Sequence, residues 1–368
     1  MTLPEILSNE ELRRTEFPVA KEKVFLAHAG VCPLPRRVTV TIRQHLAAAE
    51  TDDQEVALGN LLRDTRSLTA KLLNAQPEEI AFVGPTSLAL SYVAAGLSWR
   101  KGDNILIYFD DYPSNVYPWM ALADRGVEVR FLNVRDLGRI RPIDVTGQVD
   151  EQTRLVALAS CHFVAGWRVN LEAMGRALRQ RGIWFCVDGI QTLGAFPTTV
   201  EHVDFLAADA HKWLLGPCGA GILYVRKGVQ ERLRPVVFGW NNVRCPDYVA
   251  QEEMVFRKDA ARYEAGTHNI VGLAGLKGAL ELLLEIGVDN IAAELRRKRE
   301  LLVPALREKG FAVLHDDAPA ENTSGILSCH HPEKDLAVLH ARLAEKNIVA
   351  SLRADRAGRK YLRFSPPI

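Results

Sequence analysis

The chain has 368 residues, nearly half of them apolar, and a formal net charge of +1. That length is enough for two or three domains with a sizeable buried core. Basic and acidic residues balance and no lysine or arginine block stands out, which argues against nucleic acid as a partner. No apolar run reaches the length of a membrane span, so we expect no membrane partner either.

The N-terminus and the cysteines indicate a cytoplasmic protein. The first residues, MTLPEILSNEELRRTEF, are acidic and lack the basic head and apolar stretch of a signal peptide. Six cysteines are scattered without a CxxC pair, and two of them lie inside apolar strand-like runs. Reduced packing cysteines of cytosolic proteins have this distribution. We therefore expect a cytoplasmic location and no metal site.

Short apolar runs alternate with helical periodicity through the first two thirds of the chain. Strand-like runs lie at 78–84, 104–109, 127–134, 154–161, 183–188, 203–210 and 220–226. Helical patterns lie at 58–75, 87–97 and 171–182. This alternation predicts an α/β fold in which a mostly parallel sheet is covered by helices on both faces.

The pattern changes near residue 265. A long helical stretch runs to about Lys309, with a break near Gly287, and is followed by shorter runs at 311–316, 325–331, 334–347 and 362–367. These runs predict a smaller α+β domain. We divide the chain into an N-terminal segment, 1–25, that packs with the small domain, a large domain, 26–265, and a small C-terminal domain, 266–368.

Lys212 and Asp188 form the pair on which the functional interpretation depends. Lys212 precedes a Gly-rich run that leads into an apolar strand, and Asp188 ends the strand GIWFCVD. A buried lysine can hold pyridoxal phosphate as a Schiff base, while a carboxylate keeps its ring nitrogen protonated. An unpaired carboxylate would be costly at a strand end this apolar, and a protonated pyridine supplies a partner. The alternative for Asp188 is an N-cap on a helix over 190–196.

Other polar groups also follow strands, where open α/β sheets bind ligands. Thr86 and Ser87 begin a helix whose free N–H groups and dipole favour a phosphate, although Thr86 could be only an N-cap. Tyr112 could stack on a flat cofactor or lie in an exposed turn. Ser160 and His162 end a third strand, where a core histidine satisfied by backbone is the common outcome.

Taken together and in order, these motifs resemble the class V aminotransferase family of fold type I pyridoxal phosphate enzymes. That family includes cysteine desulfurases, kynureninase and isopenicillin N epimerase. The motifs that carry the resemblance are VFLAHAGVCPLP, GPTSLALSYVAAGL, DDYPSNVYPW, DGIQ with Asp204, HKWLLGPCGAGILYVRK, YEAGTHNIVGLAGLKGAL and LRFSP. The resemblance implies a seven-stranded-type sheet, pyridoxal 5′-phosphate as cofactor and a homodimer.

The resemblance also assigns roles to individual residues. The residues it places at the cofactor are Thr86, Ser87, Tyr112, Asp188, Gln191, His211, Lys212 and Thr267. Those it places at the substrate are His28, Arg353 and Arg363. Lys212 would form the Schiff base and move protons at Cα, with Asp188 and Tyr112 as its catalytic partners. Thr267 would reach the neighbouring site across the dimer interface.

Three features depart from the family pattern. Cysteine desulfurases carry a nucleophilic cysteine on a loop between two arginine-bearing segments, but no cysteine lies between Arg353 and Arg363. Asp209 stands where relatives often have serine or asparagine beside the phosphate, so we expect it to orient His211. The chain ends at SPPI, where relatives usually continue into another helix, so we expect an incomplete small domain.

The sequence therefore predicts an enzyme that acts at Cα or Cβ of a small amino acid, with lyase chemistry favoured. Transamination, epimerisation and cysteine desulfuration remain alternatives, because all begin with the same loss of the Cα proton. A binding module that has lost catalysis is a further alternative, and the presence of both Lys212 and Arg363 argues against it. A Rossmann dehydrogenase is disfavoured because the first strand is not followed by G-x-G-x-x-G.

Overall fold

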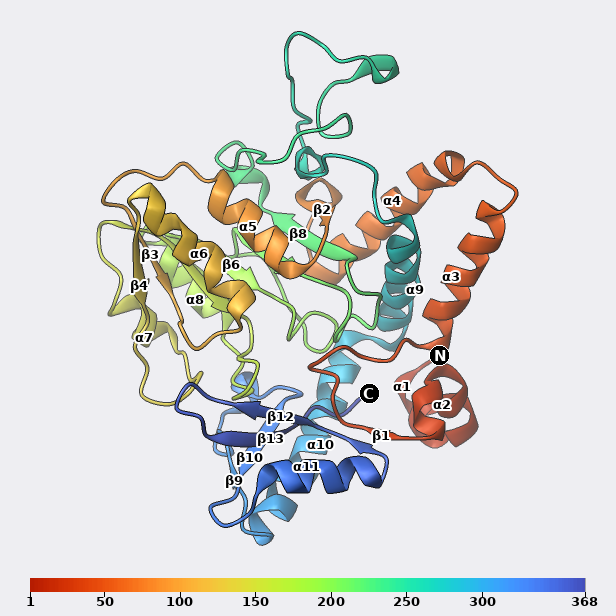
Figure 1. Ribbon diagram of the computed structural model, residues 1–368, viewed down its shortest axis with the longest axis vertical. Coiled ribbons are helices and arrows are strands. Elements are labelled where there is room, and N and C mark those ends of the chain that lie inside the picture. Colours follow the sequence, from red (N-terminus) through yellow and green to blue (C-terminus); the bar gives the residue numbers. More distant parts are fainter. Residues whose placement is uncertain (368) are drawn as a thin grey trace.

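The computed structural model describes residues 1–367 and has a seven-stranded central sheet (Figure 1). In spatial order its strands are β2 (Ile80–Val83), β8 (Gly221–Val225), β7 (Phe205–Ala208), β6 (Trp184–Asp188), β5 (Thr153–Ala159), β3 (Asn104–Ile107) and β4 (Glu128–Phe131). Strands β7, β6, β5, β3 and β4 are parallel, and β8 is antiparallel to both of its neighbours. The predicted mostly parallel sheet is confirmed.

Helices cover both faces of this sheet. Successive side chains of a strand point to opposite faces, so Leu106 packs in one core cluster while Ile105 and Ile107 pack in the other. One face carries α5 (Thr86–Gly96) and α6 (Tyr117–Met120). The other carries α4 (Gln54–Leu73), α8 (Leu171–Arg179) and α9 (Ile270–Ile286), with the short α7 (Pro142–Thr146) beside α8. Burial on both faces explains why the strands are almost continuously apolar.

Helix α9 packs closely against α4 and against α3 (Arg36–Ala49). A Cβ atom at Gly278 would lie 2.7 Å from the Thr41 hydroxyl oxygen, so glycine permits this approach. The predicted division at 265/266 stays a prediction, and the helix that follows it contacts the helices of the large sheet.

A second, four-stranded antiparallel sheet forms the lower part of Figure 1. Its order is β12 (Ser351–Ala354), β13 (Lys360–Phe364), β10 (Leu327–His330) and β9 (Ala312–Val313). Apolar residues of α10 (Val288–Glu308) and α11 (Leu336–Glu345) pack with this sheet in a third core cluster. Arg363 on β13 pairs with Ser351 on one side and Ser328 on the other.

The N-terminal segment contacts both parts of the molecule. Helix α1 (Leu3–Ser8) buries Leu3 and Ile6 in the core cluster of the large sheet, and α2 (Glu10–Glu16) follows it. Strand β1 (Val24–Phe25) pairs in parallel with β11 (Ile348–Val349) beside the small sheet. No helix in residues 1–367 combines the length and the apolar character needed to cross a membrane.

Candidate active site

Polar residues from separate strand ends meet at one edge of the large sheet. Asp188 ends β6, Ser160 follows β5, Tyr112 lies beyond β3, and the segment 209–212 follows β7. These strands are parallel, so their carboxyl ends lie at the same edge. The backbone N–H of Ser160 donates to the Asp188 carbonyl oxygen at 2.8 Å, which joins two of these ends directly.

Lys212 is a buried amine that forms no ion pair within residues 1–367. Its side chain is 8% exposed, and its ammonium nitrogen lies 5.2 Å from the centre of the Tyr112 ring. Burial, with the charges of Arg363 and Arg353, lowers the pKa of Lys212 to about 8 against the opposing effect of Asp188. A lysine held in this way is a nucleophilic amine near neutral pH.

Asp188 is fully enclosed at the end of β6. One carboxylate oxygen accepts from the Ile190 backbone N–H at 3.0 Å. Burial raises the pKa of Asp188, and that hydrogen bond, Lys212 and His211 only partly offset the effect. A cationic ring nitrogen beside this carboxylate would stabilise its charged form. The segment after Asp188 forms turns rather than the α-helix that an N-cap would require.

The amide of Gln191 has one defined orientation. The indole N–H of Trp213 can only donate, and it lies 3.0 Å from Gln191 Oε1. The Ala29 carbonyl can only accept, and Gln191 Nε2 donates to it at 3.2 Å. Because Nε2 carries two hydrogens, one remains for a ligand oxygen. Sequence reasoning missed the contribution of Trp213, whose position after Lys212 was the available signal.

A phosphate-sized anion has donors at the start of α5. Pro85 gives this helix no side-chain cap, and the Thr86 hydroxyl accepts from the Asp209 backbone N–H at 2.9 Å, which leaves its own hydrogen to donate. Asp209 in turn contacts His211 Nδ1 at 2.7 Å and accepts from the Gly219 N–H at 3.0 Å. The geometry therefore matches the expectation that Asp209 orients His211.

The turn that carries Tyr112 is anchored by a residue that sequence reasoning missed. The Asp111 carboxylate is buried and accepts from the Ala159 N–H at 2.9 Å and from the Asn115 side chain at 3.1 Å. Burial raises its pKa to about 7. Tyr112 itself is 47% exposed and meets Phe163 edge-on, with 5.4 Å between ring centres. One face of the Tyr112 ring is thus open for stacking.

His162 is held by backbone groups and stays neutral. Its Nδ1 accepts from the Ala165 N–H, and its Nε2 donates to the Asp110 carbonyl, both at 2.9 Å. Burial lowers its pKa to about 4. Ser160 is also buried and accepts from the Thr192 hydroxyl.

Arg363 completes a cationic group beside Lys212. It is 1% exposed and donates to the Phe163 carbonyl at 2.8 Å and to the Ser351 hydroxyl at 3.3 Å, while its Nε has no partner among residues 1–367. Burial, with Arg353 as second cause, lowers its pKa to about 9. Arg363 and Arg353 both act on Lys212 as nearby positive charges. The group is suited to bind a carboxylate.

The family model for class V aminotransferases matches residues 24–358. The chain belongs to the class V aminotransferase family. It is 31% identical to a probable cysteine desulfurase of Methanothermobacter thermautotrophicus over 88% of this chain and 81% of that protein. A cysteine desulfurase of Escherichia coli O8 is 32% identical over 63% of this chain and 58% of its own length.

Solved structures share the fold. An apo cysteine desulfurase from Thermococcus onnurineus NA1 matches with a TM-score of 0.88 at 23% identity, covering 97% of this chain and 93% of that one. A complex of the cystine C–S lyase C-DES with cysteine persulfide matches with a TM-score of 0.85 at 22% identity, covering 95% and 94%. The fold type I architecture predicted from the sequence is therefore confirmed.

As a class V enzyme the protein uses pyridoxal 5′-phosphate, and the residues present fit that group. The cofactor needs an amine, an acid for its ring nitrogen, a donor for its ring oxygen and an anion site for its phosphate. Lys212, Asp188, Gln191 and the start of α5 would supply these in turn, with Tyr112 as the stacking ring.

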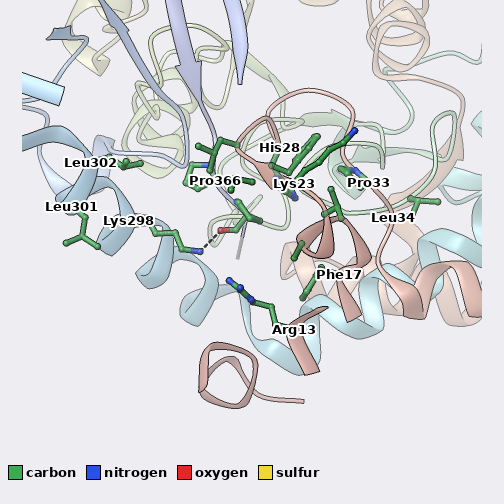
Figure 2. A pocket seen from close by; sticks show the side chains of 16 residues that line it. Arg13, Phe17, Lys23, His28, Pro33, Leu34, Lys298, Leu301, Leu302 and Pro366 are labelled. Carbon is green, nitrogen blue, oxygen red and sulfur yellow. Dashed lines mark hydrogen bonds between the residues drawn. The ribbon is translucent and has the colours of Figure 1, made fainter. Parts of the chain in front are cut away.

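The roles predicted for His28 and Thr267 stay predictions. The His28 ring lies between Phe25 and Trp213 and lines another cavity (Figure 2), to which the other predicted residues do not contribute. The backbone N–H of His28 donates to the Ser365 carbonyl, two residues after Arg363. Thr267 lines a cavity of about 320 Å³ together with Gly84 and with Gly219, whose N–H donates to Asp209.

Proposed function

We propose that the protein is a lyase that removes a sulfur-bearing or other leaving group from Cβ of a small amino acid by direct β-elimination. The proposal rests on the cationic group formed by Lys212, Arg353 and Arg363. The sequence between the two arginines contains no cysteine. Arginine binds a carboxylate with two parallel hydrogen bonds, so this group suits an α-carboxylate. Small amino acids are accordingly the expected substrates.

Each residue of the site has a definable task. Bound pyridoxal phosphate supplies an electron sink for the charge that develops at Cα. Lys212 removes the Cα proton and can return it, and its lowered pKa suits this exchange near neutral pH. Asp188 holds a proton on the ring nitrogen. Arg363 orients the carboxylate so that the Cα–H bond faces Lys212, and its own bonds to Phe163 and Ser351 limit its movement.

The cysteines support elimination rather than sulfur relay. A relay needs a thiolate that can reach the leaving sulfur. Burial raises the pKa of Cys32 to about 12, of Cys161 to about 11 and of Cys329 to about 12. Cys218 is exposed, and it follows Lys212 by six residues. It is therefore the cysteine on which a desulfurase would depend.

Relatives of the chain are named for both desulfuration and C–S lyase activity. The similar curated proteins include cysteine desulfurases, and the similar structures include the C–S lyase C-DES. Both activities break a bond to sulfur. What distinguishes them is the fate of the carbon skeleton, which becomes a keto acid with release of ammonia in elimination and alanine in desulfuration.

Product analysis with cysteine and cystine tests the proposal. We expect keto acid, ammonia and a sulfur product in equal amounts, and unchanged products from Cys218→Ser. Cys245→Ser is the matched control, because Cys245 is also accessible and lies on a distant loop. Alanine as the main product of the wild type, lost in Cys218→Ser alone, would establish the desulfurase instead.

We also infer a homodimer. Residues 236–258 project from the body between β8 and α9, as Figure 1 shows at the top, and expose several large apolar side chains. These are Phe238, Trp240, Tyr248, Val249, Met254 and Val255. An apolar arm of this kind supports a contact with another protein surface. We infer that the other surface belongs to a second copy of the chain. Thr267 follows the arm closely in sequence and would then face the phosphate site of that second copy.

Sedimentation measurements test this arrangement. We expect twice the mass of one chain for the wild type and a monomer for Trp240→Asp combined with Val249→Asp. Leu46→Asp combined with Val56→Asp removes exposed apolar side chains elsewhere and serves as control. A wild type that sediments as a monomer at micromolar concentration would contradict the inference.

A further inference from the structure

A tight turn of the small sheet contacts the loop that follows β3 in the large sheet. The turn joins β12 to β13, the strands that carry Arg353 and Arg363. Asp355 organises the turn. Its backbone N–H donates to the Arg359 carbonyl at 3.1 Å, and its carboxylate accepts from the Arg359 N–H at 2.9 Å and from the Tyr361 hydroxyl at 3.0 Å. The turn therefore has a defined shape of its own.

Arg356, at the tip of this turn, makes the contact. Its Nε lies 3.0 Å from one carboxylate oxygen of Asp110, and its Nη2 donates to the other at 3.3 Å. The guanidinium carbon lies 4.7 Å from the centre of the Phe109 ring. An exposed ion pair by itself adds little stability, but two hydrogen bonds and a stacked ring give this guanidinium one orientation.

Asp110 belongs to the segment that carries Tyr112. The Asp110 carbonyl accepts from His162 Nε2 at 2.9 Å, and Tyr112 follows two residues later. Phe109 meets Phe131 of β4 edge-on, with 4.7 Å between ring centres. These contacts hold the segment against the large sheet, so it offers the turn of the small sheet a fixed docking point.

The two arginines of the substrate half are held differently. Arg363 donates directly to the Phe163 carbonyl of the large domain. Within residues 1–367 the side chain of Arg353 donates only to the carbonyl of its neighbour Leu352. Its charge nevertheless acts on Lys212. The position of Arg353 relative to Lys212 therefore depends on where the hairpin lies.

We propose that Asp110 and Arg356 are a positioning pair for the substrate carboxylate. Their ion pair docks the β12–β13 turn on the large domain and so places Arg353 beside Lys212. The proposal rests on the carboxylate site proposed at Arg353 and Arg363. Loss of either partner frees the turn, so that binding a carboxylate must also order the hairpin, which weakens the binding.

Titration of the holoenzyme with glycine tests the proposal, with the visible absorption band as the readout. Glycine has no Cβ, so the result does not depend on which reaction the enzyme catalyses. We expect Arg356→Gln and Asp110→Asn each to raise the Kd of glycine about fivefold. The double variant should raise it no more than either change alone. Methylamine, which lacks the carboxylate, should bind all of these proteins equally and so show that the cofactor site is intact.

The sign of the Asp110→Asn effect separates docking from a long-range charge effect. Removal of a negative charge near a cationic site would by itself tighten glycine binding, whereas loss of docking weakens it. Arg359→Gln is the matched control, because it removes the same charge from an exposed arginine of the same turn. It should change the Kd of glycine by less than about twofold.

Four outcomes would overturn the positioning pair. They are tighter glycine binding in Asp110→Asn, unchanged binding in both single variants, equal weakening in Arg356→Gln and Arg359→Gln, and additive effects in the double variant. A wild type that binds methylamine as well as glycine would overturn the carboxylate site itself, and the positioning pair with it.

Discussion

The two halves of the active site are held in different ways. On the cofactor half, Asp188 and His211 are fixed by hydrogen bonds within a few residues of the strand ends that carry them. On the substrate half, Arg363 comes from the small sheet and is fixed by Phe163, a residue 200 positions away in the chain. The cofactor half is thus part of the large core, whereas the substrate half depends on how the small sheet lies on the large one. Changes in the first should impair chemistry, and changes in the second should impair binding.

The largest effect is expected at Lys212. Lys212→Ala should lose all measurable turnover, because both the amine that binds the cofactor and the base at Cα are removed. In the wild type, borohydride should attach the cofactor to the peptide that contains Lys212, as mass spectrometry can show. A Lys212→Ala protein that keeps the borohydride-stable adduct would contradict the assignment.

Asp188→Asn should lower turnover by about a hundredfold while the cofactor stays bound. A loss of about two pKa units at the ring nitrogen corresponds to about 2.7 kcal/mol. Asp204→Asn is the matched control, since Asp204 is a buried carboxylate of the same sheet that accepts from the Phe185 N–H. The control should lower the melting temperature and leave kcat of the folded protein unchanged. Near-normal kcat in Asp188→Asn would show that this carboxylate is structural.

Arg363→Lys tests the substrate half. The variant keeps a charge but loses one of two hydrogen bonds, worth about 1.5–3 kcal/mol, so KM should rise about 10- to 150-fold. The Kd of the cofactor should hardly change. If amines without a carboxylate react as well as amino acids, Arg363 does not bind the substrate in this way.

The pH dependence of cofactor uptake shows how far Arg363, on the substrate half, changes the pKa of Lys212, on the cofactor half. The neutral amine is the reactive form, and the pKa of Lys212 is about 8, so the uptake rate should be constant above that pH and fall about tenfold per unit below it. Absorbance of the apoprotein mixed with cofactor measures this rate. Arg363→Met removes a nearby positive charge and should move the midpoint to higher pH. A flat profile from pH 6 to 9 would contradict the lowered pKa.

The smallest effect is expected at Trp213. Trp213→Phe removes the hydrogen bond that orients Gln191, worth about 1 kcal/mol, so kcat should fall about fivefold and the pH titration of the visible band should shift. Trp99→Phe is the control, because its indole N–H also donates within the fold but far from the site. An unchanged titration in Trp213→Phe would mean that Gln191 is oriented by Ala29 alone.

Much of the cofactor half could be predicted from the sequence. Asp188 and Lys212 each follow an apolar run, and a parallel sheet brings such strand ends to one edge. The sequence also predicted the long helical stretch after residue 265 and its break at Gly287, which lies between α9 and α10. Helices α1, α2 and α3 were not predicted: α1 and α2 are only six and seven residues long, and α3 packs against α9, which lies far along the chain.

By itself, the sequence determined that polar groups follow the apolar strands, that Lys212 and Asp188 are among them, and that no cysteine lies between Arg353 and Arg363. Only the tertiary structure decided where side chains point. It packed His28 between Phe25 and Trp213, brought the Trp213 indole to Gln191 and made Asp111 the anchor of the Tyr112 turn. The physical reason is that a side chain's direction follows from packing against segments distant in sequence, whereas a strand end is set by its own residues.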